Sequence, residues 1–527
     1  MEYYKYQAKK WLCNQSRNEY IITSLNVCKN EEDKIHHFFS KYAFEALHIQ
    51  IAEVLIKVYE ENKTEKDKSE YYLMFKDKRL DELRNIYTLF KKIPESLTTI
   101  VKEMQEYICE RCNKIKNNKD LNEDPVKFIN EFIELKREFY LILDAFFERN
   151  LVISQGIDFG FHLSFKDYDT FPKYLASYAD FQLSVGLKEK ENLQEELFNN
   201  ILYFVTCLSQ KDIFLSYHSR FLANRLLNNT SLSRDSEALL ISKLIESCDY
   251  NNVYKLQSIV RDINLSMDLQ SEFQSSNISK EKKIPEMSLK ILSLTNWPVF
   301  DIVKFSLPNL LLKCAQNFET FYYLKAPGKK LFWLFSQGNC ELKTNYLSKP
   351  YYLITSVFQY AILEQFNFKD SIMYCDLSNI IQLSQDIITN NLKDLYKEGR
   401  QLILKDNVKE LICEPNESLK INLEFSHSTL KINLIPMSSK EDINGTKNEE
   451  MATRINKQRE LIVDCIIVRI MKINKVLNYN SIIEKVFQEC NLFKPDPSFI
   501  KQQIESLFER EFLKRDENDR NTIIYCP

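Results

Sequence analysis

The fold of this chain is decided by the stretch DIFLSYHSRFLANRLLNN, residues 212–229. Its apolar residues recur three or four positions apart, so they fall along one face of a helix. They are Phe214, Tyr217, Phe221, Leu222 and Leu226. A helix with one apolar face needs a partner to cover that face. We therefore expect residues 212–229 to form a helix packed within a group of other helices.

Outward from this stretch, helical spacing covers most of the first 250 residues. It is clear from Ile129 to Leu143 and again from Leu197 to Val205. Two stretches interrupt it: KNNKDLNEDP, residues 116–125, is polar, and GIDFGFHLSFKDYDTFP, residues 156–172, carries two glycines and a proline. We expect a break between helices at each of them, as in a stacked helical array or bundle.

The composition excludes several classes of protein. The chain has 527 residues, 71 of them basic and 74 acidic, for a formal net charge of −3, and only 7 are glycine. Neither G-x-G-x-x-G nor G-x-x-x-x-G-K-[ST] occurs, which excludes the nucleotide-binding folds that need such turns. The near-neutral charge gives no bulk attraction to nucleic acid. The start is too polar for a signal peptide, and no apolar run is long enough to span a membrane, so we expect a cytoplasmic or nuclear protein.

The sequence offers no catalytic or metal site of its own. Thirteen cysteines are scattered along the chain, which favours reduced core residues over a disulfide framework. Cys109 and Cys112 form a single C-x-x-C with no second pair, so we interpret them as two helical core cysteines rather than a zinc site. Neither H-E-x-x-H nor G-x-S-x-G is present. We expect no cofactor, no metal and no enzyme activity from the chain alone.

After about residue 285 the sequence changes its period. Leu331 to Phe335 follows the turn signal Pro327-Gly328 and is apolar throughout, which predicts a strand buried on both sides. SLKINLEF (418–425) and TLKINLIP (429–436) alternate apolar and polar residues. Because a short polar stretch joins them, they are predicted to form an antiparallel hairpin.

Two groups of three helices, each closed by a pair of strands, are also predicted. The first has helices at 353–366, 377–383 and 387–395 and an extended pair around 401–404. The second has helices at 461–473, 481–490 and 498–510 and strands at 512–514 and 522–525. This is the winged-helix pattern. A polar run, residues 438–450, is expected to join the two halves as a flexible linker.

Several motifs of this sequence together resemble the cullin family. They are L-A-x-R-L-L at 222–227, S-R-D-S-E at 233–237, K-L-Q-x-I-x-x-D at 255–262, Asn296-Trp297-Pro298, and I-V-R-I-M-K at 467–472. The likeness is broad and weakens towards the N-terminus. A cullin normally carries three helical repeats, and this sequence has room for little more than one.

The resemblance implies a mainly α protein. Its parts are a shortened cullin-repeat helical stalk, a helical bundle, a small α/β domain with a strand hairpin, and two winged-helix units. The implied domains are the stalk at 1–165, a four-helix bundle at 166–285, the α/β domain at 286–440 with an embedded winged helix at 350–408, and a C-terminal winged-helix neddylation domain at 450–527.

The resemblance also implies a function, that of the non-catalytic scaffold of a multisubunit RING-type ubiquitin ligase. A cullin binds a RING-box protein, whose N-terminal strand adds to a sheet in the C-terminal half, and the RING holds a ubiquitin-conjugating enzyme. The candidate residues for this contact are Leu331, Phe332, Trp333, Leu334 and Phe335. Substrate adaptors of the Skp or BTB type bind the outer repeats of cullins, so the resemblance leaves such an adaptor as a possible partner of this shortened repeat region.

Lys472 is the residue that the family motif marks for attachment of a ubiquitin-like modifier. From spacing alone it shares a helix face with Leu461, Cys465 and Val468, which is typical of an ordinary surface lysine. The resemblance instead implies that its amine attacks the thioester on a conjugating enzyme and forms an isopeptide bond. We expect the modification to release the terminal winged helix from a packed arrangement and so activate the ligase.

Two alternatives stay open at this point. One is a cullin-like scaffold of another complex that recruits no standard adaptor. The other is a nucleic-acid-binding regulator, because winged helices often place their third helix in the major groove. The candidate third helix here, residues 498–511, has more acidic than basic side chains, which disfavours contact with phosphates.

Overall fold

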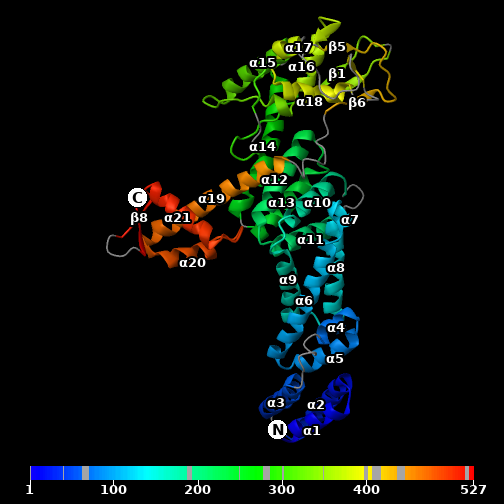
Figure 1. The fold of residues 1–527 in the computed structure, drawn as a ribbon, viewed down its shortest axis with the longest axis vertical. Coiled ribbons are helices and arrows are strands. Elements are labelled where there is room, and N and C mark those ends of the chain that lie inside the picture. The colour runs from blue at the N-terminus through cyan, green and yellow to red at the C-terminus, as the bar shows by residue number, and fades with distance from the viewer. Residues whose placement is uncertain are drawn as a thin grey trace. The chain divides into compact units, whose positions relative to one another are not determined.

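The computed structural model describes residues 2–38, 41–61, 70–186, 193–248, 250–276, 285–298, 302–347, 349–396, 401–405, 417–435, 446–516 and 521–527. These residues are mostly helical (Figure 1), which confirms the predicted class. Contacts divide the chain into two compact units. Unit 1 consists of Met1–Phe221, Ser231–Val253 and Glu460–Pro527, and unit 2 of Leu222–Thr230 and Tyr254–Arg459. The finer division into four domains stays a prediction.

Helices follow one another from the N-terminus. They are α1 (Glu2–Asn14), α2 (Arg17–Phe38), α3 (Lys41–Glu61), α4 (Glu70–Lys76), α5 (Leu80–Phe90), α6 (Leu97–Lys116), α7 (Lys119–Asn122), α8 (Pro125–Phe146), α9 (Leu151–Phe165), α10 (Phe171–Phe181), α11 (Gln194–Cys207), α12 (Lys211–Asn228) and α13 (Arg234–Cys248). The stretch quoted first is α12, as predicted. The polar run at 116–125 does separate α6 from α8, where Asp124 accepts the backbone N–H of Val126 at 3.0 Å as a helix cap.

The break predicted at residues 156–172 is wrong over most of its length, because residues 156–165 lie inside α9. Its two glycines serve close packing: α9 lies against α6 (Figure 1). A Cβ atom on Gly156 would lie 2.5 Å from Val101 Cγ1, and one on Gly160 would lie 3.2 Å from Ile108 Cδ1. Glycine therefore allows this helix pair to approach closely instead of ending the helix.

Unit 2 contains a small mixed sheet whose strands follow two helices along the chain. After α14 (Tyr250–Ser275) and α15 (Asn309–Lys325) come β1 (Asn339–Lys343) and β2 (Tyr352–Ser356), which pair antiparallel, and β6 (Lys431–Asn433) pairs parallel to β2. The strand predicted at 331–335 is wrong. Leu331–Leu334 belong to neither helix nor strand, and Phe335 begins a short 3₁₀ turn. No described strand pairs with these residues, and the first strand begins four residues later.

The predicted hairpin is also corrected. Its two segments do form strands, β5 (Ser418–Ile421) and β6, but they belong to different sheets. Leu419 of β5 is buried in the core of the embedded winged helix, whereas β6 lies beside β2. Alternation correctly indicated which residues face inward, but each strand finds a better partner elsewhere than in its neighbour along the chain.

The first winged helix is confirmed. It consists of α16 (Val357–Gln365), β3 (Ser371–Met373), α17 (Tyr374–Ile381), α18 (Gln385–Tyr396), β4 (Ile403–Lys405) and β5, with sheet order β3-β5-β4. Most helix bounds differ from the prediction by a few residues, and two differences change the assignment of a segment. The first helix begins at Val357 because residues 352–356 form β2, and the second wing strand lies beyond residue 408.

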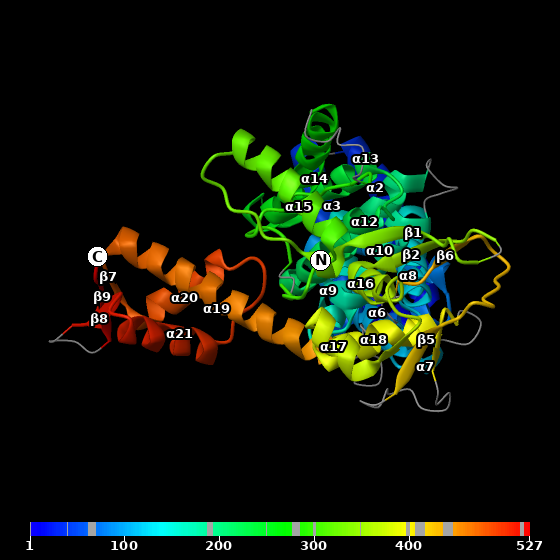
Figure 2. The same ribbon diagram turned by 90° about the horizontal axis from the view of Figure 1, so that it is seen from above.

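The second winged helix ends the chain and is also confirmed. Its elements are α19 (Thr446–Asn474), β7 (Val476–Asn478), α20 (Tyr479–Glu489), α21 (Pro497–Glu509), β8 (Leu513–Arg515) and β9 (Thr522–Tyr525), with sheet order β7-β9-β8 (Figure 2). The flexible linker predicted at 438–450 is wrong for residues 446–450, because these residues form the first turn of α19. The remainder of that run lies outside the described residues.

Candidate functional site

Lys472 lies in the last turn of α19, and its side chain is exposed. The helix buries a different face, formed by Val463, Ile467, Ile470 and Met471. This buried stripe fixes the rotation of α19, so the face that carries Lys472 points outward. Within the described part of the chain, no hydrogen bond or ion pair engages the Lys472 amino group.

The cations on either side of Lys472 are held by neighbouring groups. Arg469 forms an ion pair of 2.5 Å with Glu489 at the end of α20. Lys475 has a positive φ of 64°, and its carbonyl accepts the backbone N–H of Tyr525 at 2.9 Å. Its ammonium lies 5.3 Å from the centre of the Tyr525 ring. Lys472 is therefore the amine in this turn that is presented without a competing partner.

The face shared with Lys472 is partly apolar, as the spacing indicated. Leu461 is 63% exposed, Cys465 is exposed and Val468 is half-buried. Ile473, the next residue along the chain, is 73% exposed. The amine thus stands at the edge of exposed apolar side chains, which offers an approaching protein both a nucleophile and a surface to cover.

The five residues predicted to bind a RING partner lie between α15 and β1. Phe332 is 63% exposed, and the other four are half-buried. The indole N–H of Trp333 donates to Glu319 Oε1 on α15 at 2.7 Å, and its ring stacks on Phe335. Among the described residues, no backbone N–H of Leu331–Leu334 donates to another backbone group. This segment has the open main chain on which strand addition depends.

A second segment of this kind was not predicted. Residues 287–293, which we call the strap, run along α14 without belonging to a helix or strand. From Leu289 onward, every second strap residue donates its backbone N–H to a side chain of α14: Leu289 to Gln270 Oε1 (3.3 Å), Ile291 to Ser266 Oγ (2.7 Å) and Ser293 to Asp262 Oδ2 (3.0 Å). Two residues of extended chain and four residues of helix each rise by about 6 Å, so the strap and α14 share one repeat.

The strap ends at a carboxylate that joins two of the sequence motifs. Asp262, from K-L-Q-x-I-x-x-D, accepts the indole N–H of Trp297, from Asn-Trp-Pro, at 2.9 Å, and the Ser293 hydroxyl at 2.6 Å. Trp297 is buried. The alternation of Met287, Leu289 and Ile291 was the signal in the sequence that could have identified the strap.

The strap and residues 331–335 rest on one small apolar core. Its buried members are Phe273 from α14 and Phe318 and Tyr322 from α15. Against it pack side chains from both segments: Met287, Leu289 and Ile291 from the strap, and Leu331 and Trp333 from the other. Two main-chain segments without strand partners are therefore seated on the same support.

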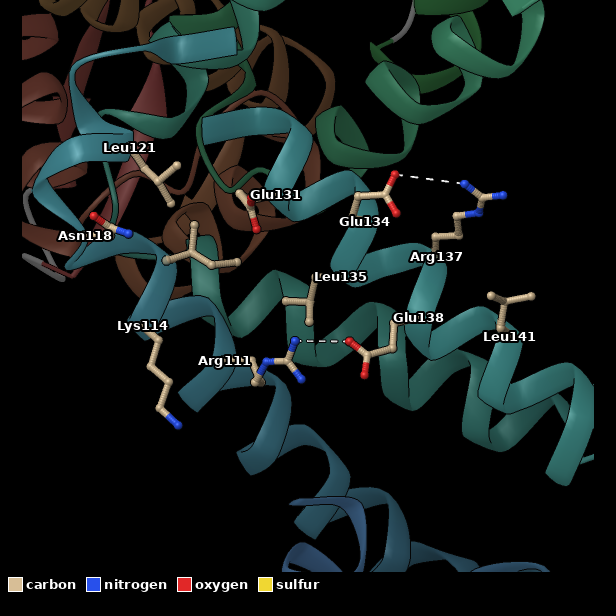
Figure 3. Close-up of a pocket in the computed structure, with 11 residues that line it drawn as sticks. Arg111, Lys114, Asn118, Leu121, Glu131, Glu134, Leu135, Arg137, Glu138 and Leu141 are labelled. Atoms are coloured by element: carbon tan, nitrogen blue, oxygen red, sulfur yellow. Dashed lines mark hydrogen bonds and ion pairs between the residues drawn. The ribbon is translucent and has the colours of Figure 1, made fainter. Parts of the chain in front are cut away.

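A cleft of about 650 Å³ lies between the end of α6 and α8 in unit 1 (Figure 3). Two ion pairs form among its lining side chains. Arg111 and Glu138 point towards each other at 3.1 Å, and Arg137 lies 4.0 Å from Glu134. The lining holds three basic and three acidic side chains, so the cleft has no net charge to hold an ionic ligand, and we do not assign it a function.

The remaining chemical expectations concern cysteines and metals. Cys109 and Cys112 both lie on α6, as expected, and burial raises the pKa of the Cys112 thiol to about 12, so it is protonated and unreactive at neutral pH. In the residues that the structure covers, no group of three or more His, Cys, Asp and Glu is arranged to hold a metal. None of the described helices is long and apolar enough to cross a membrane.

Comparison with known proteins matches nearly the whole chain to one family. The cullin alpha solenoid domain matches residues 1–270, the cullin alpha+beta domain residues 291–425, and the cullin protein neddylation domain residues 458–519. Lys472 lies within the third match, and Leu331–Phe335 lie within the second.

Individual relatives agree with these matches. Cullin-2 of Caenorhabditis elegans is 27% identical over 554 residues, which cover 98% of this chain and 68% of the relative. Cullin-1 of Oryza sativa subsp. japonica is 26% identical, with 94% of this chain and 69% of the relative covered. Cullin-3 of Caenorhabditis elegans is 26% identical, with 99% and 72% covered. The chain thus spans about 70% of the length of these relatives.

Proposed function

Because the chain belongs to the cullin family, whose members are scaffold subunits of ubiquitin ligases, we propose that it binds a RING-box protein through unit 2 and so positions a ubiquitin-conjugating enzyme for substrate ubiquitination. On this proposal the chain itself stays non-catalytic, and the partner supplies the RING. The observation that carries the proposal is a pair of segments, the strap and residues 331–334, that lie on one apolar core and pair with none of the described strands.

Strand addition explains how such segments recognise a partner. In an extended chain, successive residues turn their N–H and C=O groups to opposite edges. On one edge of the strap, the backbone N–H groups of Leu289, Ile291 and Ser293 point towards α14. The N–H and C=O groups of residues 288, 290 and 292 therefore point to the outer edge. A partner strand laid along this edge, or along residues 331–334, gains main-chain hydrogen bonds. Covering the exposed Phe332 ring adds apolar burial.

The proposal includes covalent activation at Lys472. Its exposed amine, once neutral, attacks the carbonyl carbon of the modifier's C-terminal thioester on a conjugating enzyme. The C–N bond forms, the C–S bond breaks, the enzyme's cysteine leaves as thiolate, and the amine loses a proton to water. An acceptor lysine needs an approachable amine, and the exposure of Lys472 and the absence of a described partner for it support this role.

Modification would act by changing how the terminal winged helix is packed. In unit 1, the Leu492 carbonyl between α20 and α21 accepts the backbone N–H of Lys211, the first residue of α12, at 2.9 Å. Leu492 and Phe493 beside it are buried. A protein attached at Lys472 competes for space with such contacts, so we expect it to favour release of the winged helix and its activation of the ligase.

The decisive test is binding of a purified RING-box protein to the full chain. We expect stable binding that is lost when the N-terminal strand of the RING-box protein is deleted. Phe332→Ser should weaken binding by about tenfold or more, because it removes an apolar contact at the centre of the proposed interface. Phe368→Ser is the matched control: Phe368 is 78% exposed but lies on the embedded winged helix, so binding should stay within about twofold of the wild type. Equal binding of the strand-deleted RING-box protein would contradict the proposal.

A further inference from the structure

Two of the three tryptophans in this chain make the same unusual contact. The Trp297 indole N–H donates to Asp262 on α14 at 2.9 Å, and the Trp333 indole N–H donates to Glu319 on α15 at 2.7 Å. Trp297 follows the strap, and Trp333 lies within residues 331–335. Each segment that lacks a strand partner is therefore tied to a helix by one indole–carboxylate hydrogen bond, which we call a clasp.

We propose that the two clasps are positioning elements, which hold the strap and residues 331–334 in a docking-ready arrangement before a partner strand arrives. This inference rests on the function proposed above, since it assigns to Asp262, Trp297, Glu319 and Trp333 a role in binding the RING-box protein. None of the four needs to contact that partner; they act through the main chain that they hold in place.

Apolar packing alone does not fix the strap. Met287, Leu289 and Ile291 are only half-buried against the core, so sliding along α14 changes their apolar contacts little. Asp262 Oδ2 accepts three hydrogen bonds: from the backbone N–H and the hydroxyl of Ser293, and from the Trp297 indole. Any slip of the strap breaks the first two, and hydrogen bonds to a charged acceptor are stronger than neutral ones. Asp262 therefore helps to set the register of the strap on α14, and the clasp from Trp297 holds the Asp262 carboxylate in the position that Ser293 needs.

The second clasp works in the same way at the other segment. The Trp333 ring stacks on Phe335 with its plane tilted by only 9° and meets the Phe318 ring edge-on. Glu319 neighbours Phe318 on α15, so the carboxylate and the core ring hold the indole from two sides. Phe332 is left outside, 63% exposed, between Leu331, which packs against the apolar core, and the clasped Trp333.

Positioning of this kind affects affinity through conformational entropy. A segment that is already ordered loses less freedom when a partner strand pairs with it, so the complex is tighter. If a clasp is removed, the segment is held less firmly in the complex as well, so the paired strands separate more readily. We expect the loss to appear mainly as faster dissociation, since most affinity changes among variants of one interface lie in the dissociation rate.

The test uses Trp297→Phe and Trp333→Phe in the full chain, because phenylalanine keeps an aromatic ring and removes only the N–H donor. Hydrogen exchange of the unbound chain should be about tenfold faster at the amides of Leu289, Ile291 and Ser293 in Trp297→Phe, and unchanged at β2. Dissociation of a purified RING-box protein should be about tenfold faster for each variant. Trp11→Phe on α1 is the matched control and should change neither.

Each outcome decides the inference. Faster strap exchange together with faster dissociation supports it. Unchanged strap exchange, or faster exchange with unchanged dissociation, overturns it while leaving the proposed function intact. Faster exchange throughout unit 2 would show that the clasp merely stabilises the fold, which also overturns it. If the wild-type chain does not bind the RING-box protein at all, the proposed function fails, and the positioning role fails with it.

Discussion

The two winged helices of this chain share one topology and differ in how their first helix is held. Both run helix, strand, two helices and two strands, with the last strand in the middle of the sheet. In the embedded unit α16 has 9 residues and begins at a capping box, in which Ser356 and Gln359 bond each other's backbone. Gln359, fully buried, also donates to the Leu434 carbonyl beyond β6 at 2.8 Å.

In the terminal unit, by contrast, the first helix is long and its end is exposed. Its first helix, α19, has 29 residues, and its last turn leaves Lys472 and Ile473 exposed. The comparison teaches that the winged-helix topology does not decide the role of the unit. Buried hydrogen bonds to neighbouring strands make the embedded unit part of a rigid framework. The exposed end of α19 instead makes the terminal unit a surface that presents Lys472 to other proteins.

The largest expected effect concerns attachment of the modifier at Lys472 in the terminal unit. Lys472→Arg keeps the charge and removes the nucleophilic amine, so the species carrying the modifier should disappear completely. The measurement is gel mobility after reaction with the modifier and its activating and conjugating enzymes. Lys475→Arg, three residues away and also exposed, is the control and should leave the shifted band in place. A shifted band that persists with arginine at 472 means that another lysine is the acceptor.

The next effect tests the framework. Gln359→Leu leaves the buried Ser356 N–H and the Leu434 carbonyl without their partner, which should lower the free energy of unfolding of unit 2 by about 2–3 kcal/mol. Urea unfolding followed by circular dichroism measures this. Gln502→Leu, an exposed glutamine on α21 of the terminal unit, should change stability by less than about 0.5 kcal/mol. Equal effects of the two substitutions would remove the distinction drawn between the units.

The smallest expected effect concerns the contribution of two ion pairs to the stability of the terminal unit. Asp464 on α19 pairs with Arg510 at 2.6 Å, with 12% of the Asp464 side chain and 43% of the Arg510 side chain exposed. Since the pair is partly solvated, Asp464→Asn should cost about 1 kcal/mol. Arg515→Gln breaks a pair with Glu505 that is about half exposed on both sides, and should cost less than about 0.5 kcal/mol. A larger cost for the Arg515 substitution would reverse the expected ranking.

The sequence predicted local features well and pairings poorly. Both winged helices were identified from their periodicity, and the face that Lys472 shares with Leu461, Cys465 and Val468 followed from helical spacing, because side-chain direction along a helix is set by local geometry. The hairpin was wrong since alternation specifies faces and not partners: Leu419 and Ile432 are both buried as expected, in different sheets.

Other features were missed because they depend on contacts between residues that are far apart in the sequence. Gly156 and Gly160 appeared to break a helix, yet their role depends on Val101 and Ile108 in another helix. The apolar run at Leu331–Phe335 suggested a buried strand, but no described strand of this chain pairs with it. Asp262 and Trp297 were each recognised in a motif, and their hydrogen bond, 35 positions apart, appears only in three dimensions.

The matched repeat of the strap and α14 determines which insertions, deletions and substitutions the strap tolerates. Deleting or inserting one residue between Met287 and Ser293 would exchange the two edges of the strap downstream and turn core side chains outward. Replacing Ser288, whose side chain is exposed, leaves the core side chains in place and removes only a long hydrogen bond of 3.5 Å to Gln270 Oε1. Among natural variants of this chain, the strap should therefore vary in residue type at alternate positions and scarcely at all in length.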